Sequence, residues 1–487
     1  MKEYKSFVQR IGVTGISSIL VSLSNLIILP ILTKNISVSD YGIYVQIGVT
    51  LTLIPIFSTL GLVGAMTRFL ASKKGMVNDI QEGFYTIFFS IVGVSIFVST
   101  LLFILAPNLA HLLFNNNVLV AQLLPILIFI ATLNVVISFY FRTFQQMTKY
   151  SIFVVSQAYL TVLLVSYFAI TDSNIIYVVI GSLIAQIITF IVGFIIIIRE
   201  VGLKIPRFKH LREYLSFSIP AMPTLLSNWM VDSSDRYLIS IFLGTVFVGY
   251  YNPGYTIGWS VIGLLAAPFN IILPSLLPYH YDQGQLDNVK VFLKYSLKYF
   301  LIFAIPAFFG LSLLSKQFIY VLTNPEIAAN GYLVTPFTAL SAVFFGCYVI
   351  FFNILFLEKN TKILGSIWIL SAIVNLILNI ILIPIFGFLA AAAATLFVYG
   401  LSLALTIYYS GKFLKFDHEW PSIIKSLFSS VVMSVIILIF YPNGLYNLIL
   451  IVLVSATVYL ALFYALKGFK KEEIKFFKDL IKSSANN

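Results

Sequence analysis

Long runs of apolar residues, separated by short polar segments, follow one another along the whole chain. Most runs reach the roughly 20 residues that a helix needs to cross a bilayer, and the ten-residue alternation typical of a transmembrane barrel is not the pattern. The pattern predicts an all-α, polytopic membrane protein with 14 transmembrane helices. The predicted spans lie near 11–33, 41–67, 83–106, 118–141, 151–170, 174–198, 214–243, 247–278, 295–315, 332–357, 363–384, 387–410, 422–441 and 445–466.

Composition supports this interpretation. Of the 487 residues, 60% are hydrophobic and only 10% are charged, far too little polar surface for a soluble protein of this length. The single cysteine, Cys347, lies in an apolar run, so neither an internal disulfide nor a cysteine metal site is expected. The basic start of the chain resembles a signal peptide. Its apolar run is too long, however, and no cleavage motif ends it, which favours an uncleaved first span.

The distribution of positive charge predicts the orientation. The formal net charge is +12, and with 14 spans the side that carries the N-terminus receives 27 of the 30 Lys and Arg residues. Basic residues concentrate on the cytoplasmic side of membrane proteins. We therefore expect a multi-pass protein of the cell membrane with both termini cytoplasmic. The charge needs no nucleic-acid partner, because it lies beside anionic lipid headgroups.

The longest basic loop divides the chain, with six spans before it and eight after it. We predict an N-lobe of six spans, a basic cytoplasmic linker, a C-lobe of six spans, an extra helix pair and a basic tail. Their ranges are 1–198, 199–212, 213–411, 412–466 and 467–487. The tail either lies on the membrane as an amphipathic helix, with Ile474, Phe477 and Ile481 on its apolar face, or is a solvated basic segment.

Short matches between the lobes predict a repeat. SDYGIY precedes span 2 and FVGYYN precedes span 8, which aligns Gly42 with Gly249 and Tyr44 with Tyr251. Thr-Lys also recurs at the turns after spans 4 and 10. These matches favour two six-helix lobes related by a pseudo-twofold axis along the membrane normal.

The stretch WMVDSSDR places three charged residues in span 7. A charge inside a bilayer costs several kcal/mol, so it usually faces a bundle interior or a wet cavity. At helical spacing Asp232, Asp235 and Arg236 share one face, and Asn228 extends it by a turn. We favour a substrate-binding or ion-coupling site, in which one carboxylate pairs with Arg236 and the other binds a proton or sodium ion. The alternatives are a structural Asp–Arg pair that locks two helices, and a segment near the external surface.

Further candidates are weaker. Arg10, Arg68 and Arg142 end spans on the cytoplasmic side, where they act as positive-inside anchors or contact a diphosphate at the mouth of a cavity. Ser18 and Asn25, in a serine-rich first span, are candidate cavity-lining residues. Asn375 and Asn379 in span 11 either line the cavity or form an interhelical hydrogen bond.

No motif indicates catalysis. The four histidines lack metal-ligand spacing, and the sequence has no phosphate-binding glycine loop or nucleophile elbow. We expect no metal and no cofactor beyond a coupling cation. The external loops are too short for a membrane glycosyltransferase or polymerase, so we do not expect an enzyme.

Three segments resemble polysaccharide flippases of the Wzx type, in the multidrug/oligosaccharidyl-lipid/polysaccharide exporter superfamily. They are GISSILVSLSNLIILPILTKNISVSDYGIYVQI, SNWMVDSSDRYLISIFLGTVFVGYYNPGYTIG, and GSIWILSAIVNLILNIILIPIFGFLAAAAATLFVYG, which holds Asn375, Asn379, Pro384 and Gly387. The resemblance implies two six-helix lobes around a central cavity. It also implies translocation of a polyprenyl-diphosphate-linked oligosaccharide from the cytoplasmic to the outer leaflet.

The leading hypothesis is therefore a lipid-linked saccharide flippase that works by alternating access, as a monomer, beside polysaccharide-assembly proteins. A cation-coupled multidrug exporter of the same superfamily is the main alternative, although such exporters usually have 12 spans. A membrane glycosyltransferase or polymerase, and a non-transporting scaffold, are the remaining alternatives.

Overall fold

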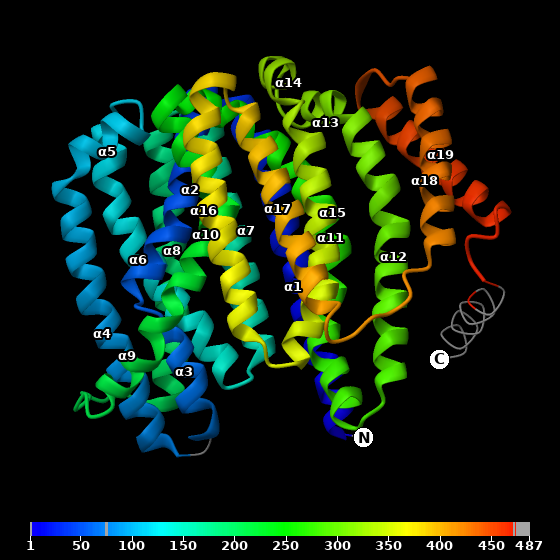
Figure 1. Ribbon diagram of the computed structural model, residues 1–487. Helices are drawn as coiled ribbons and strands as arrows, with labels where there is room; N and C mark the ends of the chain where they lie inside the picture. Colours follow the sequence, from blue (N-terminus) through cyan, green and yellow to red (C-terminus); the bar gives the residue numbers. More distant parts are fainter. Residues whose placement is uncertain (1, 74–75, 471–472, 474–487) are drawn as a thin grey trace. The chain divides into compact units, whose positions relative to one another are not determined.

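The computed structural model of the chain describes residues 2–73, 76–470 and 473, with side chains from residue 12 onward in these ranges. All regular structure in the described residues is helical (Figure 1), which confirms the predicted fold class. The long helices are α1 (Lys2–Asn35), α2 (Val38–Ser58), α4 (Val77–Ile104), α6 (Val118–Thr143), α7 (Met147–Thr171), α8 (Ile175–Val201), α10 (Met222–Leu243), α11 (Thr245–Asp282), α12 (Leu286–Leu313), α15 (Val334–Leu357), α16 (Thr361–Phe386), α17 (Leu389–Ser410), α18 (Trp420–Ile439) and α19 (Gly444–Ala465).

These long helices correspond one to one with the predicted spans. In the described residues, 13 helices are long and apolar enough to cross a membrane. The span that does not qualify is α10, which is 22 residues long but carries Asp232, Asp235 and Arg236 near its middle.

Short helices occupy segments that the sequence pattern left as loops or merged into spans. They are α3 (Leu62–Leu70), α5 (Ala106–Leu113), α9 (Leu211–Ser218), α13 (Ser315–Leu322) and α14 (Pro325–Gly331), with the 3₁₀ turns η1 (Ala71–Lys73) and η2 (Ile219–Ala221).

Two predicted spans are interrupted. The span near 41–67 breaks between α2 and α3, where Leu60 and Gly61 adopt left-handed conformations with φ of 49° and 68°. The span near 214–243 comprises α9, η2 and α10. Pro220 lies in η2 and Pro223 in the first turn of α10, where the missing N–H groups are tolerated.

The chain divides into two compact units. Unit 1 contains residues 1–253, 322–327 and 365–398, and unit 2 contains 254–321, 328–364 and 399–487. In unit 1, α7 packs against α1 and α8, and α6 packs against α4 and α8 (Figure 1). In unit 2, α12 packs against α15 and α18, and α18 against α19. These boundaries do not follow the predicted lobes, whose division stays a prediction.

The two glycines aligned by the predicted repeat meet where α2 and α11 begin, inside unit 1. A Cβ atom at Gly42 would lie 1.9 Å from the carbonyl oxygen of Thr245. A Cβ atom at Gly249 would lie 2.5 Å from the carbonyl oxygen of Val38. Each glycine thus packs on the residue four positions before the other, a reciprocal contact of the kind that a repeat produces. Only residues without a Cβ allow two helix backbones to approach so closely.

Candidate functional site

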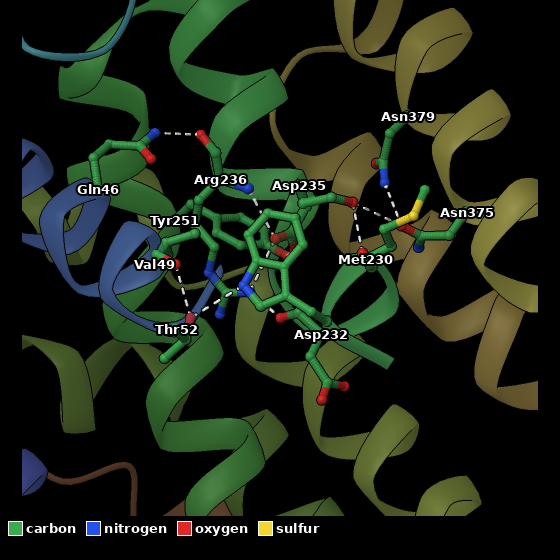
Figure 2. Close-up of polar contacts among 12 residues, drawn as sticks. Gln46, Val49, Thr52, Met230, Asp232, Asp235, Arg236, Tyr251, Asn375 and Asn379 are labelled. Atoms are coloured by element: carbon green, nitrogen blue, oxygen red, sulfur yellow. Dashed lines mark hydrogen bonds and ion pairs between the residues drawn. The ribbon is translucent and has the colours of Figure 1, made fainter. Parts of the chain in front are cut away.

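The charged residues of α10 form a buried ion pair. Asp235 and Arg236 have exposed fractions of 1% and 5%. The Asp235 Oδ1 atom accepts hydrogen bonds from the Nη1 atom of Arg236 at 2.9 Å and from the backbone N–H of Arg236 at 2.8 Å. The hydroxyl of Tyr251, on α11, donates to the Oδ2 atom of the same carboxylate (Figure 2). Both oxygens of Asp235 are therefore bonded, as a buried carboxylate requires.

Arg236 is held by further contacts. Its Nη1 atom also donates to the backbone carbonyl of Asp232, and its guanidinium carbon lies 5.6 Å from the ring centroid of Tyr251. The side-chain amide of Gln46, on α2, donates to the backbone carbonyl of Arg236 (Figure 2). The ion pair with Asp235, the ring of Tyr251 and the amide of Gln46 together hold this turn of α10 in place.

Two more hydrogen bonds join α10 to α2. The hydroxyls of Thr50 and Tyr237 are 2.6 Å apart, and the indole N–H of Trp229 donates to the hydroxyl of Thr52 at 3.0 Å. The ion pair therefore lies beside a polar seam between two helices. This arrangement matches the structural Asp–Arg pair that the sequence left open as an alternative.

Asp232 has different surroundings from Asp235 and Arg236. Asp232 is exposed, and in Figure 2 its carboxylate points away from the Asp235–Arg236 pair. Arg236 contacts the backbone of Asp232 and pairs with Asp235, because adjacent side chains can meet where the arginine folds back along its own helix. Asn228 is half-buried, one turn before Asp232. The role predicted for these four residues stays a prediction.

The two asparagines of α16 contact α10. Asn375 and Asn379 are fully buried, and the amide of Asn379 donates to the Oδ1 atom of Asn375 at 3.0 Å. The Ser234 hydroxyl donates to the same oxygen at 3.4 Å. The Ser234–Asn375 contact is an interhelical hydrogen bond of the kind expected, and the cavity-lining role predicted for the two asparagines stays a prediction.

A pocket of about 580 Å³ lies among α1, α2, α7 and α8 of unit 1. Ser18 and Asn25 are on its wall, together with Ser22, Tyr44 and Tyr150. Ten of the 15 described residues that line it carry a hydroxyl or an amide, and none is Asp, Glu, His, Lys or Arg. The serines of the first span thus do more than pack helices, since they supply one side of a polar cavity.

An amide network supports the floor of this pocket. The Oε1 atom of Gln186 accepts from the Gln157 amide at 2.6 Å and from the Asn134 amide at 2.7 Å. Gln157 and Gln186 both line the pocket. These residues were not predicted from the sequence, although glutamines inside apolar spans are unusual and offered a signal. Tyr251 was predicted only as a repeat position, and Gln46 was not predicted at all.

The predicted arginines have different surroundings. The side chain of Arg10 lies outside the described residues, and Arg68 is exposed at the end of α3. Arg142, also exposed, stands 5.0 Å from the ring centroid of Phe139 and 5.6 Å from that of Tyr150. Since Tyr150 lines the pocket, Arg142 lies at its edge.

Unit 2 holds a buried cation as well. Lys298, on α12, is fully buried, and its ammonium bonds both carboxylate oxygens of Glu473 at 2.7 and 2.9 Å. Glu473 belongs to the predicted tail, whose positions Ile474, Phe477 and Ile481 lie outside the described residues. Among the residues that are described, no group of His, Cys, Asp and Glu side chains has the arrangement of a metal site.

Fold and site together define a polytopic helical membrane protein with a buried ion pair and a polar pocket whose described lining residues are uncharged. The chain belongs to the polysaccharide biosynthesis protein family, whose sequence profile matches residues 7–279, more than half of the chain. This membership confirms the resemblance drawn from the sequence.

Two curated relatives come from Haloferax volcanii. A probable low-salt glycan biosynthesis flippase, Agl15, is 23% identical over 233 residues, which cover 48% of this chain and 49% of the relative. A probable flippase, AglR, is 30% identical over 234 residues, covering 46% and 48%. The alignments span about half the length of these relatives.

Solved structures share the fold across most of the chain. The lipid II flippase MurJ in an inward closed conformation matches with a TM-score of 0.77 at 18% identity, covering 96% of this chain and 99% of that one. An inward-facing multidrug transporter of the MATE family matches with a TM-score of 0.63 at 12% identity, covering 80% and 94%.

Proposed function

We propose that this protein is a flippase for lipid-linked saccharides. It moves a polyprenyl-diphosphate-linked oligosaccharide from the cytoplasmic to the outer leaflet of the cell membrane by alternating access. The observation that carries the proposal is the match to two relatives that are themselves named as flippases, one of them of glycan biosynthesis. Both alignments cover half of the relatives, so activity and substrate come to this chain as a proposal.

The chemistry of unit 1 supports the proposal. Lipid-linked saccharides have a polar head and an apolar tail, and only the head must be shielded from the hydrocarbon. A polar pocket enclosed by apolar helices provides that shield. The exposed guanidinium of Arg142 at the pocket edge suits a diphosphate, because its planar fork bonds two phosphate oxygens at once.

The orientation follows from charge. The excess of Lys and Arg on the N-terminal side places both termini in the cytoplasm under the positive-inside rule. The pocket edge marked by Arg142, at the end of α6 on that side, then receives substrate from the inner leaflet.

We assign ion coupling to Asp232 rather than to Asp235. Both carboxylate oxygens of Asp235 are bonded to Arg236 and Tyr251, whereas the carboxylate of Asp232 is exposed and points away from that pair. An exposed carboxylate can be reached by a coupling ion, whereas a buried one in an ion pair is shielded from it.

The test is the accumulation of lipid-linked saccharide on the cytoplasmic face in cells without this protein. We expect accumulation, its reversal by the wild-type chain, and its persistence with Asp232→Asn. Asp172→Asn changes an exposed aspartate in a loop and serves as the matched control, which should restore export. Cells that hold no second flippase and still accumulate nothing would exclude the proposed function. Rescue by Asp232→Asn would exclude the coupling assignment alone.

A further inference from the structure

The pocket of unit 1 offers a defined set of hydrogen-bonding atoms. The Gln186 amide is oriented by its two donors, because its Oε1 atom accepts from Asn134 and Gln157. Its Nε2 atom is therefore the remaining arm of the amide and a donor, on a residue that lines the pocket. The orientation follows from the network and gives the pocket an N–H group at a fixed place.

Hydroxyl groups supply acceptors around that donor. The Ser18 hydroxyl donates to the carbonyl of Thr14 at 3.0 Å, and the Thr161 hydroxyl donates to the carbonyl of Gln157 at 2.8 Å. Because each proton is used within its own helix, each hydroxyl oxygen presents its lone pairs to the cavity. The wall of α1 and α7 is thus rich in acceptors, facing a donor on α8.

Among the described residues that line the pocket, none carries a charge that would neutralise a charged ligand. An anion enclosed without a cation, or a cation enclosed without a carboxylate, would lose its hydration free energy without an ion pair to compensate for it. An alkyl chain is also a poor occupant, because ten of the 15 described lining residues carry polar groups. Sugar hydroxyls both donate and accept, and Tyr44 and Tyr150 add ring faces with polar tips. The volume of about 580 Å³ is within the range of small-molecule sites.

We infer that the pocket formed by α1, α2, α7 and α8 binds an uncharged saccharide, with Gln186 as the hydrogen-bond donor that recognises it. The charged diphosphate lies outside the pocket, on the side of Arg142. This inference rests on the proposed function and specifies its substrate class: the sugar that enters the pocket carries no carboxylate or phosphate.

The experiment measures binding to the purified full chain with matched probes. The probes are four sugars, each linked to citronellyl diphosphate. They form two pairs of a neutral and an acidic sugar: glucose with glucuronic acid, and galactose with galacturonic acid. Each pair differs only by a hydroxymethyl group against a carboxylate. Citronellyl diphosphate without sugar is the reference. At least one neutral sugar should bind tenfold more tightly than its acidic counterpart and than the reference.

The variant Gln186→Glu tests the contribution of the Gln186 N–H donor to binding. The glutamate keeps an oxygen that accepts from Asn134 and Gln157, so the network is retained, but the N–H group is replaced by a charged oxygen. We expect the affinity for the neutral-sugar probe to fall at least tenfold and the affinity for the reference to stay the same. Gln283→Glu, the same substitution in an exposed loop, should change neither. Tyr44→Phe removes one pocket hydroxyl and should weaken the neutral probe roughly threefold, which provides a second variant if Gln186→Glu elutes as aggregate.

Each contrary result has a distinct meaning. Equal or tighter binding of the acidic sugars, or full binding by a folded Gln186→Glu variant, overturns the inference and leaves the flippase proposal standing. Sugar probes that bind no better than the reference also overturn only the inference. A wild-type chain that binds none of the diphosphates counts against both, and the accumulation test in cells then decides the function.

Discussion

The charge cluster of α10 and the pocket of α1, α2, α7 and α8 are both polar regions of unit 1, and they differ in where their polar atoms point. Asp235 and Arg236 direct their polar atoms at each other and at Tyr251. In the pocket, Gln186 and Ser18 satisfy part of their capacity within the protein and present the rest to a cavity. The first arrangement holds helices together, and the second can bind a ligand.

The difference has a physical cause. A charge in the membrane interior is too costly to leave without a partner, so the protein pairs it. Uncharged hydroxyls and amides cost less to expose to a wet cavity, and can remain available. The residues most conspicuous in the sequence are therefore the ones least available to a substrate.

Removing one member of the ion pair should have the largest effect on stability. Arg236→Ala leaves the carboxylate of Asp235 buried with Tyr251 as its remaining side-chain partner. We expect a loss of about 3–5 kcal/mol in the free energy of unfolding, measured by thermal unfolding in detergent. The double variant Asp235→Asn, Arg236→Ala should recover part of that loss. A single variant as stable as the wild-type chain would contradict a structural role for the pair.

Tyr251→Phe removes a single hydrogen bond to the same carboxylate. Because the acceptor is charged, we expect a smaller loss of about 1.5–3 kcal/mol by the same measurement. Tyr237→Phe, on α10, is the control, because it removes a phenol hydroxyl whose partner is the neutral Thr50. If both variants lose the same stability, the Tyr251 hydroxyl has no special place in the cluster.

The close approach of α2 and α11 gives a prediction that does not involve charge. Gly42→Ala would place a methyl group 1.9 Å from the Thr245 carbonyl oxygen, so one backbone must move. Overpacking of this kind costs about 1–3 kcal/mol. Gly48→Ala, on the same helix, meets no atom within 4 Å and should be neutral or slightly stabilising. Equal thermal stability of the two variants would rule out the reciprocal glycine contact.

The smallest expected effect is a pH dependence in unit 2. Hydrogen bonding to Lys294 lowers the pKa of Asp417. Burial opposes ionisation of Glu419, but hydrogen bonds from Lys294 and Lys470 outweigh it and lower its pKa as well. Carboxyl groups with lowered pKa values stabilise the fold above their unfolded values, about pH 4, and lose that contribution as the pH falls through the folded values.

Because Asp417 is largely exposed, this contribution should not exceed about 1 kcal/mol. Unfolding curves between pH 6 and pH 3 should show the loss, and the double variant Asp417→Asn, Glu419→Gln should lose less stability over the same range. A double variant with the same pH dependence as the wild-type chain would assign the effect to other groups.

Much of the fold could be predicted from the sequence, because hydrophobic length and the Lys and Arg distribution depend on the bilayer rather than on tertiary contacts. The breaks at Gly61 and Pro220 were missed, since apolar residues continue across both. Span 7 was found, although α10 is not among the helices that qualify as membrane spans by length and composition.

The site was harder to predict. Spacing on an ideal helix grouped Asp232 with Asp235, but it could not show that Arg236 folds back onto the adjacent residue. The pairing of Lys298 with Glu473 was not predicted, because the two residues lie 175 positions apart in the chain. The pocket joins Ser18, Gln157 and Gln186 from three helices, a combination that no local pattern contains.

One paired measurement tests the central claim, that the charges hold the fold while the uncharged pocket recognises the substrate. Binding of the neutral citronellyl diphosphate sugar and the thermal midpoint are measured on the same preparations of Gln186→Glu and Tyr251→Phe. The account predicts that Gln186→Glu, whose carboxylate still accepts from Asn134 and Gln157, loses at least tenfold in binding with a smaller fall in midpoint than Tyr251→Phe. It predicts that Tyr251→Phe lowers the midpoint with unchanged binding. The reverse pattern, with the sugar lost in Tyr251→Phe and retained in Gln186→Glu, would contradict it.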